Sequence, residues 1–221
     1  MEFGKAFSFV FEDQDWVKKI GIAGLLLIIP ILGGLVVSGW ALEVTRRVIH
    51  REAEVLPDWS KFGDYLVKGL MLFVVGFVYA LPIILLSACQ QGGILFAQNN
   101  GDDSLTGVIG VLSICISCVV ILYSIVLGFV IPAAYARLAV TGQIGSAFRF
   151  GEVIGLVRAA PSAYLIVFLG EIIAGFIGSL GLIVCVIGMF FTYAYAMAMM
   201  AHLWGQAYNV ASGDQSLQPA Y

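Results

Sequence analysis

The sequence has 221 residues, of which 61% are hydrophobic and only 11% charged, with a formal net charge of −3. Soluble globular domains carry roughly 25% charged residues, so the polar residues here are too few to cover a water-soluble particle. The mean hydropathy of +0.99 and the 26 glycines are typical of membrane helices. Composition therefore excludes a soluble globular protein and predicts an all-α, polytopic membrane bundle, with residues 1–211 as a single membrane domain.

Five segments are apolar over the roughly 20 residues that a helix needs to cross a bilayer. They cover residues 20–44, 65–88, 107–136, 162–180 and 185–206. The last two belong to one apolar stretch, which is predicted to fold into a hairpin between Ser179 and Gly188, where Gly181 and Gly188 can turn the chain. Residues 212–221 form a polar tail that is expected to be loosely attached.

The first apolar segment has two interpretations. Its length predicts a full membrane span over residues 20–44. Pro30 and the pair Gly33-Gly34 interrupt it, and such residues can also break a helix into a re-entrant hairpin. We favour the full span and keep the re-entrant hairpin as the alternative.

Three shorter stretches interleave aromatic residues with charges. They are Phe3 to Trp16, Asp58 to Lys68 and Phe148 to Arg158. Each pattern predicts an amphipathic helix lying in the membrane interface. The alternative is that these stretches are only the hydrated ends of the neighbouring spans.

The basic residues predict the orientation in a cytoplasmic (inner) membrane. Loops 45–64 and 137–161 carry most of the Lys and Arg, whereas the loop from Gln90 to Thr106 carries none. By the positive-inside rule the two basic loops are cytoplasmic. Five full spans then place the N-terminus outside, against which Lys5, Lys18 and Lys19 argue.

Glu171 is the most informative single residue, because it lies in the middle of an apolar segment. An ionisable group at that depth costs roughly 2.5–3.5 kcal/mol on insertion scales and marks a paired or functional site. Counting back through the predicted hairpin places Tyr193 and Tyr195 near its level, as hydrogen-bond donors. The interpretations are a structural hydrogen bond, a proton or cation site, and a contact between subunits.

A face of small residues in the third segment includes Ser113, Ser117 and Ser124, which lie at helical spacing. Such a face can line a pore, or it can let helices approach closely and share hydrogen bonds, which is the commoner use. The fourth and fifth segments carry further small residues that predict tight helix packing. These are Gly170, Ala174, Gly178, Ala194 and Ala198.

The basic cluster Arg46, Arg47 and Arg51 predicts contacts with anionic lipid headgroups, although control of topology explains it equally well. The four cysteines, Cys89, Cys115, Cys118 and Cys185, lie in apolar runs and are expected to be buried packing thiols. Only two histidines are present, far apart, so no metal site is expected. No catalytic set, cofactor site or nucleic-acid signal is recognisable.

Several stretches together resemble a family of prokaryotic multi-pass membrane proteins, the domain of unknown function 4013. They include Phe9-Val10-Phe11-Glu12-Asp13, Gly39-Trp40, Arg46-Arg47-Val48, Leu56-Pro57-Asp58-Trp59, Lys68-Gly69-Leu70 and Ala201-His202-Leu203-Trp204-Gly205-Gln206. The resemblance covers most of the chain. It implies a membrane protein and supplies no activity.

The sequence favours a non-enzymatic structural or accessory component of the membrane. Its partners are expected to be membrane lipids and either further copies of the chain or the other subunits of a membrane complex. The alternative is a small transporter or channel that uses Glu171 and the face formed by Ser113, Ser117 and Ser124.

Overall fold

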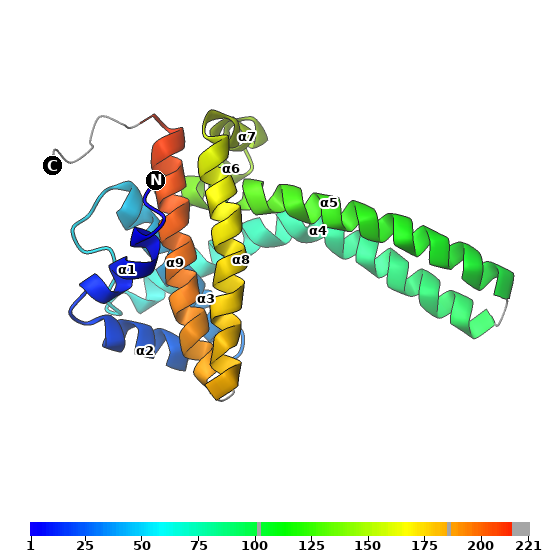
Figure 1. Ribbon diagram of the computed structural model, residues 1–221, viewed down its shortest axis with the longest axis horizontal. Coiled ribbons are helices and arrows are strands. Elements are labelled where there is room, and N and C mark those ends of the chain that lie inside the picture. Colours follow the sequence, from blue (N-terminus) through cyan, green and yellow to red (C-terminus); the bar gives the residue numbers. More distant parts are fainter. Residues whose placement is uncertain (101–102, 185–186, 214–221) are drawn as a thin grey trace. The chain divides into compact units, whose positions relative to one another are not determined.

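A computed structural model describes residues 1–100, 103–184 and 187–213 (Figure 1). Its helices are α1 (Lys5–Glu12), α2 (Trp16–Leu27), α3 (Leu32–Ile49), α4 (Phe62–Asn100), α5 (Asp103–Thr141), α6 (Ile144–Ala147), α7 (Phe150–Ala159), α8 (Pro161–Val184) and α9 (Gly188–Ala211). These ranges contain no strand, which confirms the predicted all-α class. Cys185 and tail residues 214–221 lie outside the described residues.

The chain divides into two compact units, although the sequence predicted a single domain. Unit 1 consists of Met1–Val75 with Phe129–Tyr221, and unit 2 consists of Gly76–Gly128. The core of unit 1 is formed by α3 and α9, which are buried along much of their length. Small residues let these two helices approach closely, because a Cβ atom on Gly205 would overlap the side chain of Val48.

The single span predicted over residues 20–44 is wrong as one continuous helix. The segment breaks into α2 and α3 at residues 28–31, since Pro30 cannot continue a helix and Ile31 has a positive φ of 64°. The chain then folds back, so that a Cβ on Gly33 would overlap the carbonyl group of Leu26. This break follows the hairpin alternative.

The predicted hairpin of the last two apolar segments is present as α8 and α9, which lie side by side (Figure 1). At its closed end the backbones of Gly181 and Gly188 meet, leaving no room for a side chain at Gly181. Thr192 strengthens the pairing one turn further on, where its hydroxyl donates to the carbonyl oxygen of Gly178 at 2.8 Å.

The N-terminal segment packs onto α9. α1 buries Ala6, Phe9 and Val10, and the hydroxyl of Tyr195 donates to the carbonyl oxygen of Phe7 at 2.8 Å. The predicted helices near residues 3–16 and 148–158 therefore exist as α1 and α7. The third, at Asp58 to Lys68, is instead the beginning of the long helix α4.

Unit 2 is an antiparallel pair formed by the inner parts of α4 and α5. The Tyr123 hydroxyl donates to the carbonyl oxygen of Tyr79 at 3.0 Å, and Gln90 donates to Ser117 Oγ at 3.1 Å. Residues 76–100 extend for about 37 Å at 1.5 Å per residue, which covers the roughly 30 Å hydrocarbon core of a bilayer. Most of the large apolar side chains of this unit are exposed.

Within the described ranges, three helices are long and apolar enough to cross a membrane: Phe62–Asn100, Ser104–Thr141 and Pro161–Ile183. The sequence predicted five spans. The first is broken at Pro30, and α9, which carries Thr192, Tyr193, Tyr195 and His202 among its apolar residues, is not one of the three.

Candidate functional site

Glu171 lies in unit 1, where α8, α9 and the end of α5 meet. The indole Nε1 of Trp204 donates to Glu171 Oε1 at 3.3 Å. The ring of Trp204 packs against that of Tyr135 with centroids 5.3 Å apart. One turn before Glu171, Phe168 stacks on Phe129 at 5.0 Å. Three helices thus enclose one carboxyl group with aromatic side chains.

The hydrogen-bond partner of Glu171 differs from the two tyrosines expected. Tyr195 donates to the backbone of Phe7 instead, and Tyr193 is exposed and packs beside Gly178. Trp204 could not be identified from the sequence, because the register of α8 on α9 differs from the one expected. Gly170, the neighbour of Glu171, faces Leu203, so the residues level with Glu171 lie about two turns further along α9.

Glu171 belongs to a polar layer of unit 1, which we define as Glu43, Thr45, Glu171, His202 and Asn209. The Thr45 hydroxyl donates to the carbonyl oxygen of Ala201 at 3.0 Å. Asn209 donates to the carbonyl oxygen of Val48 at 3.2 Å. Trp204 lies between Ala201 and Asn209 along α9, and it contacts Glu171. Glu171 is therefore level with the charged end of α3, at residues 45–48.

The N-terminal arm closes this layer from one side. The backbone N–H of Glu2 donates to Gln206 Oε1 at 2.8 Å, and Gln206 Nε2 donates back to the carbonyl oxygen of Glu2 at 3.1 Å. His202 stacks on Phe9 with centroids 4.4 Å apart and lies 3.0 Å from Gln206 through Nδ1. The side chain of His202 is buried.

The serine face predicted on α5 is divided between two environments in unit 2. Gln90 of α4 donates to the carbonyl oxygen of Ser113 at 3.2 Å and to the hydroxyl of Ser117. Ser124 is exposed, and its hydroxyl donates to the carbonyl oxygen of Val120 in its own helix. Ser113 and Ser117 therefore serve the pairing of α4 with α5.

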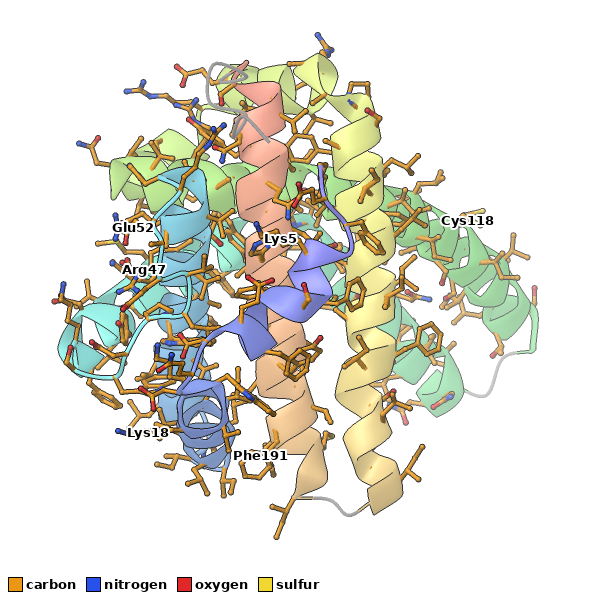
Figure 2. All side chains as sticks on the ribbon, turned by 60° about the vertical axis from the view of Figure 1, so that its left-hand side comes forward. Lys5, Lys18, Arg47, Glu52, Cys118 and Phe191 are labelled. Carbon is orange, nitrogen blue, oxygen red and sulfur yellow. The ribbon has the colours of Figure 1, made fainter. Side chains whose placement is uncertain are left out.

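A charge cluster joins α3 to the beginning of α4. Glu43 is buried and accepts hydrogen bonds from Arg46 Nε at 3.0 Å and Arg46 Nη2 at 2.6 Å. It also pairs with Lys68 of α4. Arg46 Nη2 lies 2.8 Å from Glu52, and Arg47 lies 3.6 Å from both carboxylates; Figure 2 shows Arg47 and Glu52 close together.

The environment of Glu43 keeps it ionised. Burial raises its pKa, but the hydrogen bonds from Arg46 and Lys68 outweigh burial and hold the pKa at about 2, below the ordinary 4.5. Hydrogen bonds to the charged form of a carboxylate favour that form and so lower its pKa. Glu43 was not singled out from the sequence, although its spacing of three and four residues from Arg46 and Arg47 is the signal of helical ion pairs.

Arg46 and Arg47 are thus engaged by carboxylates of the same chain. Arg47 also donates to the carbonyl oxygen of Glu54 at 2.9 Å. Arg51 is exposed and has a positive φ of 55°. The lipid-headgroup contacts expected of these three arginines remain a prediction, and the ion pairs compete with them.

The small residues expected to pack helices all lie in the interior of unit 1. Gly170 faces Leu203 so closely that a Cβ would overlap the leucine side chain, and Gly178 faces Tyr193. Ala174, Ala194 and Ala198 are buried. These residues bring α8 and α9 together.

The expectation of buried thiols is wrong for three of the four cysteines. Cys89, Cys115 and Cys118 are exposed on unit 2, because α4 and α5 turn only a narrow face toward each other. Cys185 lies outside the described residues. Among the described residues, no group of three or more His, Cys, Asp or Glu side chains is placed to hold a metal ion.

Comparison with known proteins decides the family. The family model described as "Protein of unknown function (DUF4013)" matches residues 22–187. The chain belongs to this family. No curated protein and no solved structure matches the chain.

The DUF4013 match includes the Glu43 cluster, unit 2 and Glu171. Trp204, the donor to Glu171, lies beyond the matched residues. Membership of an uncharacterised family with helices long and apolar enough to span a membrane agrees with the resemblance drawn from the sequence. It assigns no activity.

Proposed function

We propose that this DUF4013 protein is a non-enzymatic structural component of the cytoplasmic membrane that associates through unit 2. The supporting observation is how little of α4 and α5 the chain itself covers. Of their most apolar stretches, 17% and 6% are buried. A surface of this kind is suited to lipid and to other membrane helices. In unit 1 the buried side chains of Glu43, Thr45 and His202 contact groups of the same chain, as in a packed scaffold.

Association through unit 2 predicts cross-linking between copies. In native membranes, a membrane-permeant bismaleimide is expected to join chains through the exposed Cys89, Cys115 and Cys118. Replacing these three cysteines with alanine, with Cys185 retained as the matched control, should abolish the dimer band on a denaturing gel. A parent protein that stays uncross-linked, and has the mass of one chain in lipid nanodiscs, would contradict the proposal.

The second candidate is a small transporter or channel, and Glu171 is the observation that favours it. Apart from the indole N–H of Trp204, no hydrogen bond and no ion pair to its carboxylate is found in the described part of the chain. A carboxyl group with spare acceptor sites in a predominantly apolar helix is a candidate proton or cation site.

A flux measurement separates the two candidates. For a structural component, proteoliposomes loaded with a pH-sensitive or cation-sensitive dye are expected to leak no faster than empty liposomes. The transporter interpretation replaces the structural one if the parent protein conducts and Glu171→Gln abolishes the flux. Trp204→Phe should preserve assembly in that case. Size-exclusion chromatography of each variant provides the control for folding.

The orientation follows the basic residues. Loops 45–64 and 137–161 are assigned to the cytoplasm by the positive-inside rule. The charge cluster of Glu43, Arg46 and Lys68 then lies at the cytoplasmic end of unit 1.

A further inference from the structure

Two turns of unit 1 carry large exposed apolar side chains among their described residues. At the turn between α2 and α3, Ile31 is 81% exposed, and Ile28, Ile29 and Leu32 are also exposed. Near the turn between α8 and α9, Ile183 is 81% exposed, accompanied by Leu182 and Ile187. Turns that face water usually carry Gly, Asn, Asp, Ser or Pro, whereas removing large apolar side chains such as these from water is favourable.

Both turns lie at the same end of unit 1. Gly24 of α2 approaches Phe191 of α9 so closely that a Cβ would overlap the phenylalanine ring. Phe191 is one turn from Gly188, where the α8/α9 hairpin closes. Figure 2 labels Phe191 near this closed end. We name this end the apolar tip and define it as residues 28–32, 182–183 and 187.

The sequence around the tip is free of charge over long distances. No Asp, Glu, Lys or Arg occurs between Ile20 and Leu42, or between Ile172 and Gly213. The nearest charged groups are Lys19 at the beginning of α2, which pairs with Asp13, and Glu43 and Arg46 of the charge cluster in α3. Unit 1 therefore has a charged end and an apolar end.

The distance between these ends is less than the thickness of a bilayer. Thr45 is level with Ala201 through their 3.0 Å hydrogen bond. From Thr45 back to Ile31 α3 rises about 21 Å, and from Ala201 back to Gly188 α9 rises about 20 Å, at 1.5 Å per residue. The two rises agree to within about 1 Å. Both are shorter than the hydrocarbon core of a bilayer, which is roughly 30 Å thick.

We propose that the apolar tip ends inside the bilayer and contacts lipid acyl chains, so that α2 and α3 form a re-entrant hairpin that enters and leaves on the same side. This inference rests on the proposed membrane role and adds a specific depth to it. With Lys19 of α2 at the interface, the nine residues from Lys19 to Ile28 place the tip at most about 14 Å deep, about half of the way into the hydrocarbon. The backbone at the break between α2 and α3 has internal partners, as a hydrocarbon environment requires: the N–H of Leu32 donates to the carbonyl oxygen of Pro30 at 2.7 Å and that of Gly33 to Ile29 at 3.1 Å.

Single-cysteine labelling tests the depth of the tip. In a chain with all four native cysteines replaced by alanine, Ile31→Cys and Ile183→Cys place thiols at the tip. Ala53→Cys, exposed in the basic loop, is the matched control. In proteoliposomes a charged maleimide should react with the tip thiols more than about 50-fold more slowly than with the control, from either side of the membrane.

Fluorescence distinguishes lipid from protein cover. A nitrobenzoxadiazole label attached at Ile31→Cys in detergent and then reconstituted should be quenched by lipids that carry doxyl groups on their acyl chains.

Fast reaction with the charged reagent from either side would overturn the inference. So would a label that is shielded from the reagent but unquenched by the doxyl lipids, because another protein chain would then cover the tip. Carbonate extraction of the same membranes tests the membrane role separately: a protein that stays in the pellet with an accessible tip contradicts the inference alone.

Discussion

Replacing Gly69 with alanine is expected to destabilise unit 1 by about 3 kcal/mol or more, since overpacking a tight contact costs typically 1–3 kcal/mol and occasionally more. Gly69 of α4 lies against α3, and a Cβ there would overlap the carbonyl oxygen of Leu35. Gly39 makes the reciprocal contact, against the carbonyl oxygen of Tyr65. Two helix backbones touch at this crossing, so neither can move aside by changing a rotamer.

The measurement is the apparent unfolding temperature in detergent, followed by the loss of helical signal. Gly34→Ala and Gly63→Ala are matched controls, because a Cβ at either position meets nothing within 4 Å. Both controls should be neutral or slightly stabilising, since alanine is favoured over glycine in a helix interior by up to about 1 kcal/mol. If Gly69→Ala and Gly39→Ala unfold at the same temperature as these controls, the close crossing of α3 and α4 is wrong.

The membrane class and the α8/α9 hairpin could be predicted from the sequence, because both depend on local composition. Hydropathy needs no knowledge of partners, and Gly181 and Gly188 mark the closed end of the hairpin by themselves. The break at Pro30 was visible as an alternative. The choice between a span and a hairpin depended on packing of α2 against α9, which no local pattern records.

The site was less predictable, because its contacts join distant parts of the chain. Glu171 could be singled out from its apolar neighbours, whereas its partner Trp204 depends on the register of two helices over many turns. The contact of Gly170 with Leu203 places Trp204, and not Tyr193 or Tyr195, beside Glu171. The pairing of Glu43 with Lys68 depends in the same way on the glycine crossing of α3 and α4.

The glycine crossing explains why a buried charge cluster can exist at this place. Lys68 precedes Gly69, and Glu43 lies one turn after Gly39. Close approach of the two backbones brings the Lys68 ammonium group onto the Glu43 carboxylate. A small cavity of about 30 Å³ beside this pair is lined by both residues together with Met71 and Leu138, and one water molecule would fill it.

Replacing Glu43 with glutamine is expected to lower the free energy of unfolding by about 2 kcal/mol at neutral pH. The substitution keeps the shape of the side chain but leaves Arg46 and Lys68 without their shared counter-charge. Breaking a fully buried pair costs roughly 3–5 kcal/mol. The effect here is smaller because both cations are about one-third exposed and water screens them.

The stability difference between the parent and Glu43→Gln is expected to depend on pH. Because the folded chain lowers the pKa of Glu43 from 4.5 to about 2, its stabilising contribution is complete above pH 4.5 and is lost as the pH falls toward about 2. The difference in unfolding temperature between the parent and Glu43→Gln should therefore be largest at pH 7 and shrink at pH 3. Glu54→Gln, at an exposed position in the same loop region, is the control for general acid effects. A difference that is absent at pH 7, or that does not change between pH 7 and pH 3, would show that Glu43 does not hold α3 and α4 together as a carboxylate.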